Sequence, residues 1–308
     1  MMLTASDGRR ELAVLGSPIA HSKSPVLHAT AYEALGLPWS YDRAEVVPDT
    51  LRDYVESRPA DWRGLSLTMP LKQSVLPLVA SLDESARLTG AANTILFDTD
   101  AGGGRLLRGF NTDVPGIVRA LAAAGTPSAR QVLVWGGGAT AASAVMAAAE
   151  LGAEQITVQV RTPSRAQSLI ELGRSVGLRV QITRFGEGPA TRPDLVISTL
   201  PGSAGSDGAA GSVVRGEEVA RAAADGVLLL DVAYDPWPTD IVKAWSLSGK
   251  AGNGHANVLS GLAMLVHQAL LQVRIFVTGD PEIPLPREAS VLAAMLTAVG
   301  LDASGRPL

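Results

Sequence analysis

The order of apolar and polar positions is clearest near the middle of the chain, where a short apolar run meets a row of glycines. Residues 131–135 are mostly apolar, Gly136 to Gly138 follow, and an alanine-rich run extends to about Leu151. A short β-branched run closed by glycine favours a strand, and a longer run of small residues favours a helix. This stretch therefore predicts a strand, a tight turn and a helix in succession.

The same alternation continues toward the C-terminus. It predicts strands at residues 155–160, 179–183, 194–199 and 227–232, with helices at residues 165–176 and 217–224. Strands that alternate with helices are typical of a doubly wound parallel sheet. Residues 201–211, a low-complexity stretch of mainly Gly, Ala and Ser, are expected to form a mobile surface loop.

The N-terminal part has a different pattern, with strands predicted at residues 11–15, 39–46 and 64–68. Two further apolar runs, residues 91–97 and 105–110, flank a loop rich in Asp and Gly and predict a β-hairpin. Ser24 followed by Pro25 is typical of a helix start, so Ser24 is the expected N-cap of a helix that ends at Gly36. A short helix is predicted to begin at Asp49. Further helices are predicted at residues 115–124, 260–277 and 287–301.

The glycine turn has the spacing of a dinucleotide-binding motif, G-x-G-x-x-A, with Ala141 in the third position. In such a turn the first Gly allows the bend, the second lets a pyrophosphate approach the backbone, and the helix start presents N–H groups to the phosphates. The candidate cofactor residues are therefore Gly136, Gly137, Gly138, Ala139 and Thr140. A glycine turn that binds nothing is the alternative that this motif alone leaves open.

The tip of the next predicted strand indicates which dinucleotide is bound. An NAD enzyme usually places an acid there to hold the ribose hydroxyls. Here Arg161, Thr162 and Arg165 follow the strand, with no acidic residue among them. Because guanidinium groups suit phosphate oxygens, these residues predict NADP(H) as the cofactor, with a solvated basic turn as the alternative.

We predict a two-domain α/β fold from these patterns. Residues 1–115 with 258–308 form the N-terminal α/β substrate domain, and residues 116–257 form the doubly wound Rossmann-type NADP domain. The formal net charge of −4 predicts no nucleic-acid partner, and no segment is long enough in uninterrupted apolar residues to predict a membrane span. Cysteine is absent and the four His lack a metal-binding pattern, so no metal is expected. The expected compartment is the cytoplasm.

Polar side chains follow several predicted strands of the N-terminal domain. They are Ser22, Ser24, Thr68, Lys72, Asn93, Asn111 and Asp113. Ligands of open α/β sheets bind beyond the carboxyl ends of the strands, so these loops are expected to converge on a small polyhydroxylated substrate. Lys72 and Asp113 are the candidates for proton transfer. A hydrolytic triad built on His21 and Ser22 is the other interpretation, but the chain has no Gly-x-Ser-x-Gly elbow.

Taken together, these stretches resemble the shikimate dehydrogenase family over residues 14 to about 268. The resemblance rests on Gly16-Ser-Pro-Ile-Ala-His-Ser-Lys-Ser-Pro25, Leu67-Thr-Met-Pro-Leu-Lys72, Gly90-Ala-Ala-Asn-Thr94, Asn111-Thr-Asp113, Asp231-Val-Ala-Tyr234 and Gly261-Leu-Ala-Met-Leu-Val-His-Gln268. It implies NADP-dependent reduction of 3-dehydroshikimate to shikimate by hydride transfer.

The resemblance also implies roles for single residues. Lys72 is the implied proton donor, and Asp113 holds the same hydroxyl. The implied substrate ligands are Ser22 and Ser24, which hold the carboxylate, and Thr68, Asn93, Tyr234 and Gln268. Val232 and Gly261 are implied to line the nicotinamide.

Three residues depart from the family pattern: Ser66 replaces a common Asn, Ala139 replaces a Gly, and Val160 replaces the Asn that often precedes the Arg-Thr pair. The first departure affects a contact near the substrate, and the other two affect the adenine and pyrophosphate region. A quinate dehydrogenase of broader specificity and a non-catalytic nucleotide-binding sensor of the same fold are the alternatives. The expected assembly is a monomer or a homodimer.

Overall fold

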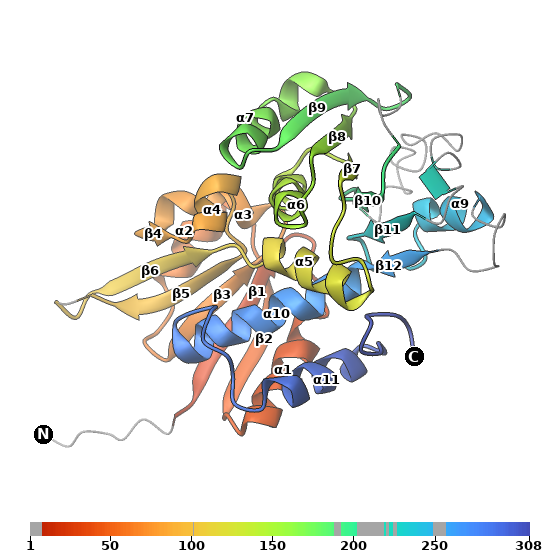
Figure 1. The fold of residues 1–308 in the computed structure, drawn as a ribbon. Helices are drawn as coiled ribbons and strands as arrows, with labels where there is room; N and C mark the ends of the chain where they lie inside the picture. The colour runs from red at the N-terminus through yellow and green to blue at the C-terminus, as the bar shows by residue number, and fades with distance from the viewer. Residues whose placement is uncertain are drawn as a thin grey trace, which may run out of the picture. The chain divides into compact units, whose positions relative to one another are not determined.

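The structure, a computed structural model, describes residues 8–100, 102–187, 192–201, 219, 222–223, 227–248 and 257–308. The chain divides into two units, each with its own sheet (Figure 1). Unit 1 comprises Met1–Thr112, Val266–Asp302 and Leu308, and unit 2 comprises Asp113–Leu265 and Ala303–Pro307. The fold is of the α/β class, as the sequence predicts.

Unit 1 is built on a mixed six-stranded sheet in the order β2-β1-β3-β5-β6-β4. Its strands are β1 (Arg10–Gly16), β2 (Trp39–Glu45), β3 (Trp62–Leu67), β4 (Ser81–Leu82), β5 (Thr94–Thr99) and β6 (Arg105–Phe110). Strands β1, β2 and β3 are parallel, whereas β5 and β6 form the predicted antiparallel hairpin. The two-residue strand β4 is too short to carry a periodic signal, and the sequence pattern missed it.

The helices of unit 1 begin close to where the sequence predicts them, with one correction at the first. They are α1 (Ser24–Leu35), α2 (Pro48–Glu56), α3 (Leu71–Ser74), the 3₁₀ turn η1 (Leu76–Leu78), α4 (Glu84–Thr89) and α11 (Glu288–Ala298). Ser24 is not the N-cap of α1: Lys23 occupies that position, and the Ser22 hydroxyl accepts a hydrogen bond of 3.3 Å from the Ser24 N–H. Helix α4 was not predicted, although Asp83 caps it by accepting from the Ala86 N–H at 2.7 Å.

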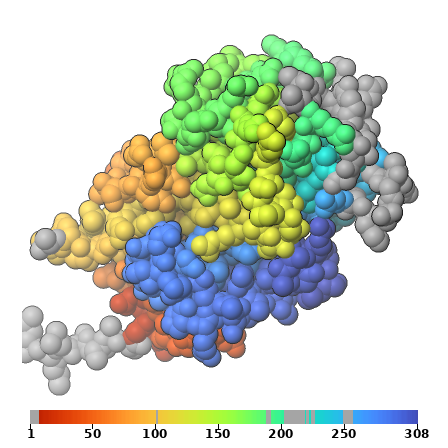
Figure 2. All heavy atoms as spheres, in the orientation of Figure 1, coloured from red at the N-terminus to blue at the C-terminus, as the bar shows by residue number. Residues whose placement is uncertain are grey.

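Helix α11 packs on α1, so a C-terminal segment completes the N-terminal sheet unit. In Figure 2 the blue atoms of the C-terminal helices lie against the red atoms of the first strand and helix. The core of unit 1 includes Leu15, Leu65, Leu67 and Ile95, all buried. Burial of this apolar surface holds the distant chain segments together.

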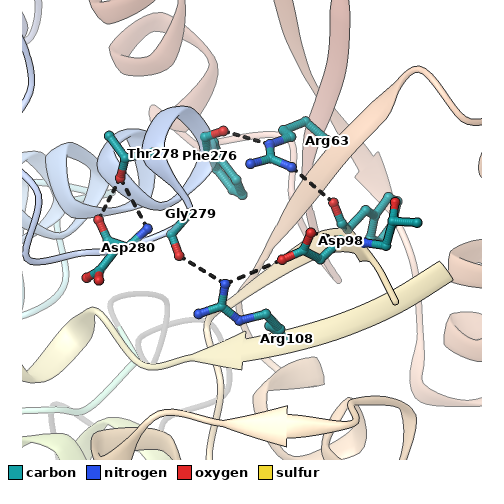
Figure 3. A network of polar contacts seen from close by, with 9 residues as sticks. Arg63, Asp98, Arg108, Phe276, Thr278, Gly279 and Asp280 are labelled. Atoms are coloured by element: carbon teal, nitrogen blue, oxygen red, sulfur yellow. Dashed lines mark hydrogen bonds and ion pairs between the residues drawn. The ribbon is translucent and has the colours of Figure 1, made fainter. Parts of the chain in front are cut away.

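The long apolar helix α10 (Gly261–Thr278) contributes its residues from Val266 onward to unit 1. Two arginines hold its C-terminal end (Figure 3): Arg63 donates to the Phe276 carbonyl at 2.7 Å, and Arg108 donates to the Gly279 carbonyl at 3.1 Å. Cations at a helix C-terminus satisfy its free carbonyls and complement its dipole. Helix α10 is long and apolar enough to cross a membrane, but 78% of it is buried, as in the core helix of a globular protein.

Unit 2 is built on a parallel six-stranded sheet in the order β9-β8-β7-β10-β11-β12. Its strands are β7 (Gln131–Trp135), β8 (Gln155–Val160), β9 (Arg179–Arg184), β10 (Leu195–Ser198), β11 (Leu228–Asp231) and β12 (Val258–Ser260). Numbered within the unit, this order is 3-2-1-4-5-6, the strand order of the Rossmann fold. The predicted doubly wound sheet is confirmed, and β12 is an additional short strand.

The helices of unit 2 are α5 (Asp113–Ala123), α6 (Ala139–Glu150), α7 (Ser168–Ser175) and α9 (Asp240–Ser248), with the 3₁₀ turn η2 (Pro163–Ala166). The single helix predicted at residues 165–176 is therefore a 3₁₀ turn followed by a shorter helix. Helix α9 was not predicted. The helix predicted at 217–224 and the loop predicted at 201–211 lie outside the described residues, apart from positions 201, 219, 222 and 223.

Candidate active site

The ends of β1 and β3 lie side by side and bring two of the predicted loops together. The Thr68 N–H donates to the Leu15 carbonyl at 2.9 Å, and the Ser17 N–H donates to the Met69 carbonyl at 3.1 Å. A Cβ on Gly16 would lie 2.5 Å from the Thr68 side chain, so only glycine allows this approach. The loop that carries Ser22 and the loop that carries Thr68 are thus fixed against each other at the carboxyl ends of β1 and β3.

Ser22 and Ser24 are both buried, although each lies in a loop or at a helix start. The Ser22 hydroxyl accepts from the Ser24 backbone, which places the two side chains at the beginning of α1. A helix start carries free N–H groups and a partial positive charge. This arrangement suits a carboxylate, the group that these serines are predicted to hold.

Lys72 lies in α3, just beyond the Thr68 loop, and its side chain is half-buried rather than fully solvated. Its carbonyl accepts from the Ala92 N–H at 2.8 Å. Asn93, which follows Ala92, bonds to both neighbouring strands. Its carbonyl accepts from the Leu67 N–H at 2.7 Å, and its N–H donates to the Phe110 carbonyl at 3.0 Å. These backbone hydrogen bonds therefore hold the loops of Thr68, Lys72 and Asn93 together at one end of the strands.

The Asn93 side chain is the centre of a buried cluster with Thr112 and Gln268. Its Oδ1 accepts from the Thr112 N–H at 2.9 Å, and because a backbone N–H can only donate, this contact fixes the orientation of the amide. Its Nδ2 then donates to Thr112 Oγ1 at 2.9 Å and to Gln268 Oε1 at 3.1 Å. The structure brings the predicted residues Asn93 and Gln268 together, and Thr112 joins them.

A second buried polar group borders this cluster and was missed at the sequence level. Gln272 accepts from Ser66 at 3.0 Å and donates to the Asn93 carbonyl at 3.2 Å, while its Oε1 lies 3.2 Å from His28 Nε2. Gln272 is four residues after Gln268, so the two share one face of α10. That spacing is the signal that would have found it.

The glycine turn of unit 2 lies between β7 and α6, at the switch point of the sheet between β7 and β10. Gly136 has φ +113°, and a Cβ there would lie 2.3 Å from Thr199 Oγ1, so this position requires glycine. By contrast, a Cβ on Gly138 would meet no atom of the described residues within 4 Å. Gly137 and Gly138 are exposed, and no side chain in the described residues caps α6 at Gly138.

The turn therefore fits a pyrophosphate, because within the described part of the chain no side chain caps the first N–H groups of α6 and no atom fills the space in front of Gly138. Ala139 and Thr140 begin the helix and are half-buried. Ala139 is the first residue of α6, and alanine is a good helix former. An alanine in place of the family's usual Gly is therefore compatible with the start of this helix.

Arg161, Thr162 and Arg165 lie at the tip of β8 and are exposed. Within the part of the chain that the structure describes, Arg161 and Arg165 have no ion pair. Their guanidinium donors are thus open to an anion. Val160, which departs from the usual Asn, is buried and lies 2.8 Å from the position that a Cβ on Gly137 would take. Its side chain packs behind the glycine turn.

At the end of β11, Asp231 is a buried carboxylate that organises the loop carrying Val232 and Tyr234. It accepts from the Thr239 hydroxyl at 2.6 Å and from the Ala233 N–H at 3.3 Å. Burial raises the pKa of Asp231 to about 6, and these hydrogen bonds partly oppose the shift. Tyr234 and Val232 are half-buried, so their side chains are accessible from solvent.

Gly261 packs directly on the backbone of this loop. A Cβ at Gly261 would lie 2.0 Å from the Val232 carbonyl oxygen, which leaves no space for any side chain. The close approach lies at the start of α10, within unit 2. The two residues predicted to line the nicotinamide, Val232 and Gly261, are therefore in contact.

Asp113 is buried and is the first residue of α5. It belongs to unit 2, whereas Lys72 belongs to unit 1, so the pairing of Lys72 with Asp113 stays a prediction. Among the described residues, no group of three or more His, Asp or Glu side chains is arranged to hold a metal ion. His267 is buried in α10, and His255 lies outside the described residues.

A parallel sheet in Rossmann order with a glycine turn at its switch point defines the class of dinucleotide-binding α/β proteins. Residues 14–95 match the family model described as the shikimate dehydrogenase substrate binding domain. The chain is 34% identical over 296 residues to the shikimate dehydrogenase (NADP(+)) of Rubrobacter xylanophilus, covering 94% of this chain and 98% of that protein. The chain belongs to the shikimate dehydrogenase family.

Two solved structures have the same fold. Shikimate dehydrogenase of Mycobacterium tuberculosis matches with a TM-score of 0.74 and 38% identity, covering 92% of this chain and 99% of that one. Shikimate 5-dehydrogenase of Thermus thermophilus, solved in complex with NADP(H) and shikimate, matches with a TM-score of 0.70 and 30% identity, covering 94% and 99%. The N-terminal α/β substrate domain and the Rossmann NADP domain predicted from sequence are confirmed.

Proposed function

We propose that this protein catalyses the reversible NADPH-dependent reduction of 3-dehydroshikimate to shikimate, a step of aromatic amino-acid biosynthesis. The observation that carries the proposal is the match over nearly the whole chain to the Thermus thermophilus enzyme, which was solved with NADP(H) and shikimate. The relatives that share most of their length with this chain carry the same name. Unit 1 then binds the substrate and unit 2 binds NADP(H).

The residues of unit 2 fit the cofactor. The N–H groups at the start of α6 receive the pyrophosphate, since among the described residues no side chain caps them and none approaches the position of a Cβ on Gly138. Arg161 and Arg165, with the Thr162 hydroxyl, hold the 2′-phosphate, because their donors are exposed. Val232 and Gly261 line the nicotinamide. When bound, NADPH supplies the hydride that adds to the ketone carbon.

The residues of unit 1 hold and protonate the substrate. Ser22 and Ser24 bind its carboxylate at the start of α1, and Thr68, Asn93 and Gln268 bind its hydroxyls. Lys72 gives a proton from its ammonium group to the ketone oxygen as the C–H bond forms, so the product is a neutral alcohol. Asp113 accepts a hydrogen bond from the same hydroxyl and stabilises the ammonium, and Tyr234 completes the substrate contacts.

The enzyme acts in the cytoplasm on a small molecule, with neither nucleic acid nor membrane as a partner, and it is a monomer or a homodimer. Light scattering coupled to size exclusion measures the assembly directly. A mass other than that of one or two chains would contradict this part of the proposal.

One assay tests the activity. The absorbance of reduced nicotinamide is followed while the purified protein oxidises shikimate or quinate with NADP⁺ or NAD⁺. We expect turnover with shikimate and NADP⁺ and a lower kcat/KM for the other three pairs. Equal kcat/KM on quinate would favour the broader dehydrogenase, and NADPH binding without turnover on either substrate would favour the sensor.

A further inference from the structure

The buried hydrogen bonds around Gln272 form one continuous chain from His28 to Asn93. Gln272 lies in α10 and is buried, as are His28, Ser66 and Thr94. Both ends of its amide are in use: Oε1 faces Ser66 and His28, and Nε2 donates to the Asn93 carbonyl and to Thr94 Oγ1, the last at 2.8 Å. A buried amide with every contact satisfied has a single orientation.

The direction of each bond in this chain follows from one contact. The Asn93 carbonyl can only accept, so Gln272 presents its NH₂ group there and its Oε1 to the other side. His28 Nε2 therefore carries the proton that it donates to Gln272. The other ring nitrogen, Nδ1, accepts from the Tyr32 hydroxyl at 3.1 Å, and burial lowers the pKa of His28 to about 3, so the ring is neutral.

The same reasoning continues into the Asn93 side chain. Thr94 Oγ1 accepts from Gln272, so its own proton goes to Asn93 Oδ1 at 2.8 Å. The Thr112 N–H also donates to Asn93 Oδ1, so the two hydrogen bonds favour the same orientation of the Asn93 amide. The Asn93 NH₂ group is thereby directed toward Gln268.

We propose that Gln272 is a positioning residue for substrate binding: it fixes the backbone carbonyl of Asn93 and, through Thr94, the orientation of the Asn93 amide. The proposal rests on the proposed function, in which Asn93 and Gln268 bind the substrate hydroxyls. The Ser66 hydroxyl donates to Gln272 Oε1. Ser66, which replaces the common Asn of the family, therefore belongs to the same chain of hydrogen bonds.

The test compares Gln272→Met and Thr94→Val with Thr278→Val. Thr278 lies at the far end of α10, where its hydroxyl is 2.7 Å from the Arg274 carbonyl and 2.8 Å from the Asp280 carbonyl, outside the chain of bonds around Asn93. We expect Gln272→Met and Thr94→Val to raise the shikimate KM and dissociation constant about tenfold, the equivalent of one net hydrogen bond. The NADP⁺ dissociation constant should not change, and Thr278→Val should lower Tm without changing the shikimate KM.

The double variant separates positioning from general destabilisation. Because both residues act through one chain of bonds, Gln272→Met combined with Thr94→Val should raise the shikimate KM no further than Gln272→Met alone. Thr94→Val removes a single hydroxyl with little change in shape and serves if Gln272→Met does not fold. Variants that lower Tm yet keep the shikimate KM within twofold of wild type would overturn the proposal.

A second readout does not require turnover. Solvent exchange of the Asn93 side-chain NH₂ protons, followed by NMR, should be slow in wild type and about tenfold faster in Thr94→Val, because the amide loses one of its fixing bonds. Unchanged exchange would contradict the positioning role even if the wild type turns out to be inactive on shikimate. Absence of wild-type turnover would instead contradict the proposed function alone.

Discussion

The two units hold their candidate site residues in opposite ways. In unit 1 the side chains Asn93 and Gln268 are buried, with 2% and 5% of their surface exposed, and they are fixed by bonds to each other and to Thr112. In unit 2 the candidate cofactor residues Gly138, Arg161 and Arg165 are exposed, and no other described residue fills the space at Gly138 or forms an ion pair with the two arginines.

This difference matches the ligands proposed for the two units, a small polyhydroxylated substrate for unit 1 and NADP(H) for unit 2. Polar side chains held in one orientation distinguish a small molecule with several hydroxyls, since a misplaced donor leaves a buried polar group unpaired. A dinucleotide is long and carries phosphates, so backbone N–H groups and exposed charged side chains suffice. Substitutions among the buried amides around Asn93 should therefore change both stability and substrate binding, whereas those in the glycine turn of unit 2 should separate the two effects.

The largest expected effect concerns Lys72, a half-buried residue beside the fixed amides of unit 1. Lys72→Ala should lower kcat by about 10²–10⁴-fold, the usual contribution of a general acid, and leave NADPH binding unchanged. Steady-state kinetics and fluorescence titration with NADPH measure the two quantities. Lys243→Ala, which removes an exposed lysine of α9 in unit 2, is the control and should retain wild-type kcat. A kcat for Lys72→Ala within a few-fold of wild type would exclude its role as proton donor.

The next comparison lies within the glycine turn. Gly136→Ala should destabilise the protein by roughly 2 kcal/mol or more, because φ +113° is strained for alanine and its Cβ would overlap Thr199. Gly138 has φ −92°, and a Cβ there would contact no described residue, so Gly138→Ala should retain the wild-type Tm but weaken NADPH binding by placing a methyl group where the pyrophosphate approaches. Thermal unfolding and NADPH titration of both variants test this. Equal NADPH affinity of Gly138→Ala and wild type would mean that the turn does not bind the phosphates.

A smaller effect is expected at the tip of β8. Arg161→Ala should raise the KM for NADP⁺ about ten- to a hundredfold, the value of one charge-assisted hydrogen bond, and leave the KM for NAD⁺ unchanged. Its Tm should stay at the wild-type value, since Arg161 is exposed and has no ion pair in the described residues. Arg174→Ala, which removes an exposed arginine of α7, is the matched control. An unchanged ratio of the two KM values would remove the argument for 2′-phosphate recognition.

The two units should also differ in the pH dependence of their stability. His28 has a pKa of about 3 in the folded protein against 6.5 when unperturbed, so acidification from about pH 7 to about pH 5 should cost unit 1 about 2 kcal/mol. Asp231 has a pKa of about 6 against 3.8, so its ionisation penalty is largest above about pH 6, and the same acidification should stabilise unit 2 by about 1 kcal/mol.

Amide hydrogen exchange at several pH values, corrected for intrinsic rates, measures the two responses separately. Amides of β1 and β3 should lose protection on acidification, and amides of β10 and β11 should gain it. Asp231→Asn should flatten the response of unit 2, and His28→Gln should flatten that of unit 1. Parallel responses of the two units in wild type would show that neither group controls local stability.

The sequence predicted most elements because their signals are local. The glycine turn, the hairpin of β5 and β6, and the βα alternation that continues from β7 through β10 each follow from periodicity and turn residues. Elements such as β4 and β12, with two and three residues, were missed because so short a run has no period. The N-cap of α1 was assigned wrongly to Ser24, since residue type alone does not separate the cap at Lys23 from the position that follows it.

The amino-acid sequence by itself determined the α/β class, the dinucleotide turn and the family, because motif order and spacing are properties of the chain. Only the tertiary structure decided which polar residues meet. His28, Ser66, Asn93, Thr112, Gln268 and Gln272 come from five separate elements and loops, and a hydrogen bond depends on distances between them that no local pattern encodes. The sheet order, which sets β7 beside β10 and Gly136 against Thr199, was likewise decided by packing between strands distant in the chain.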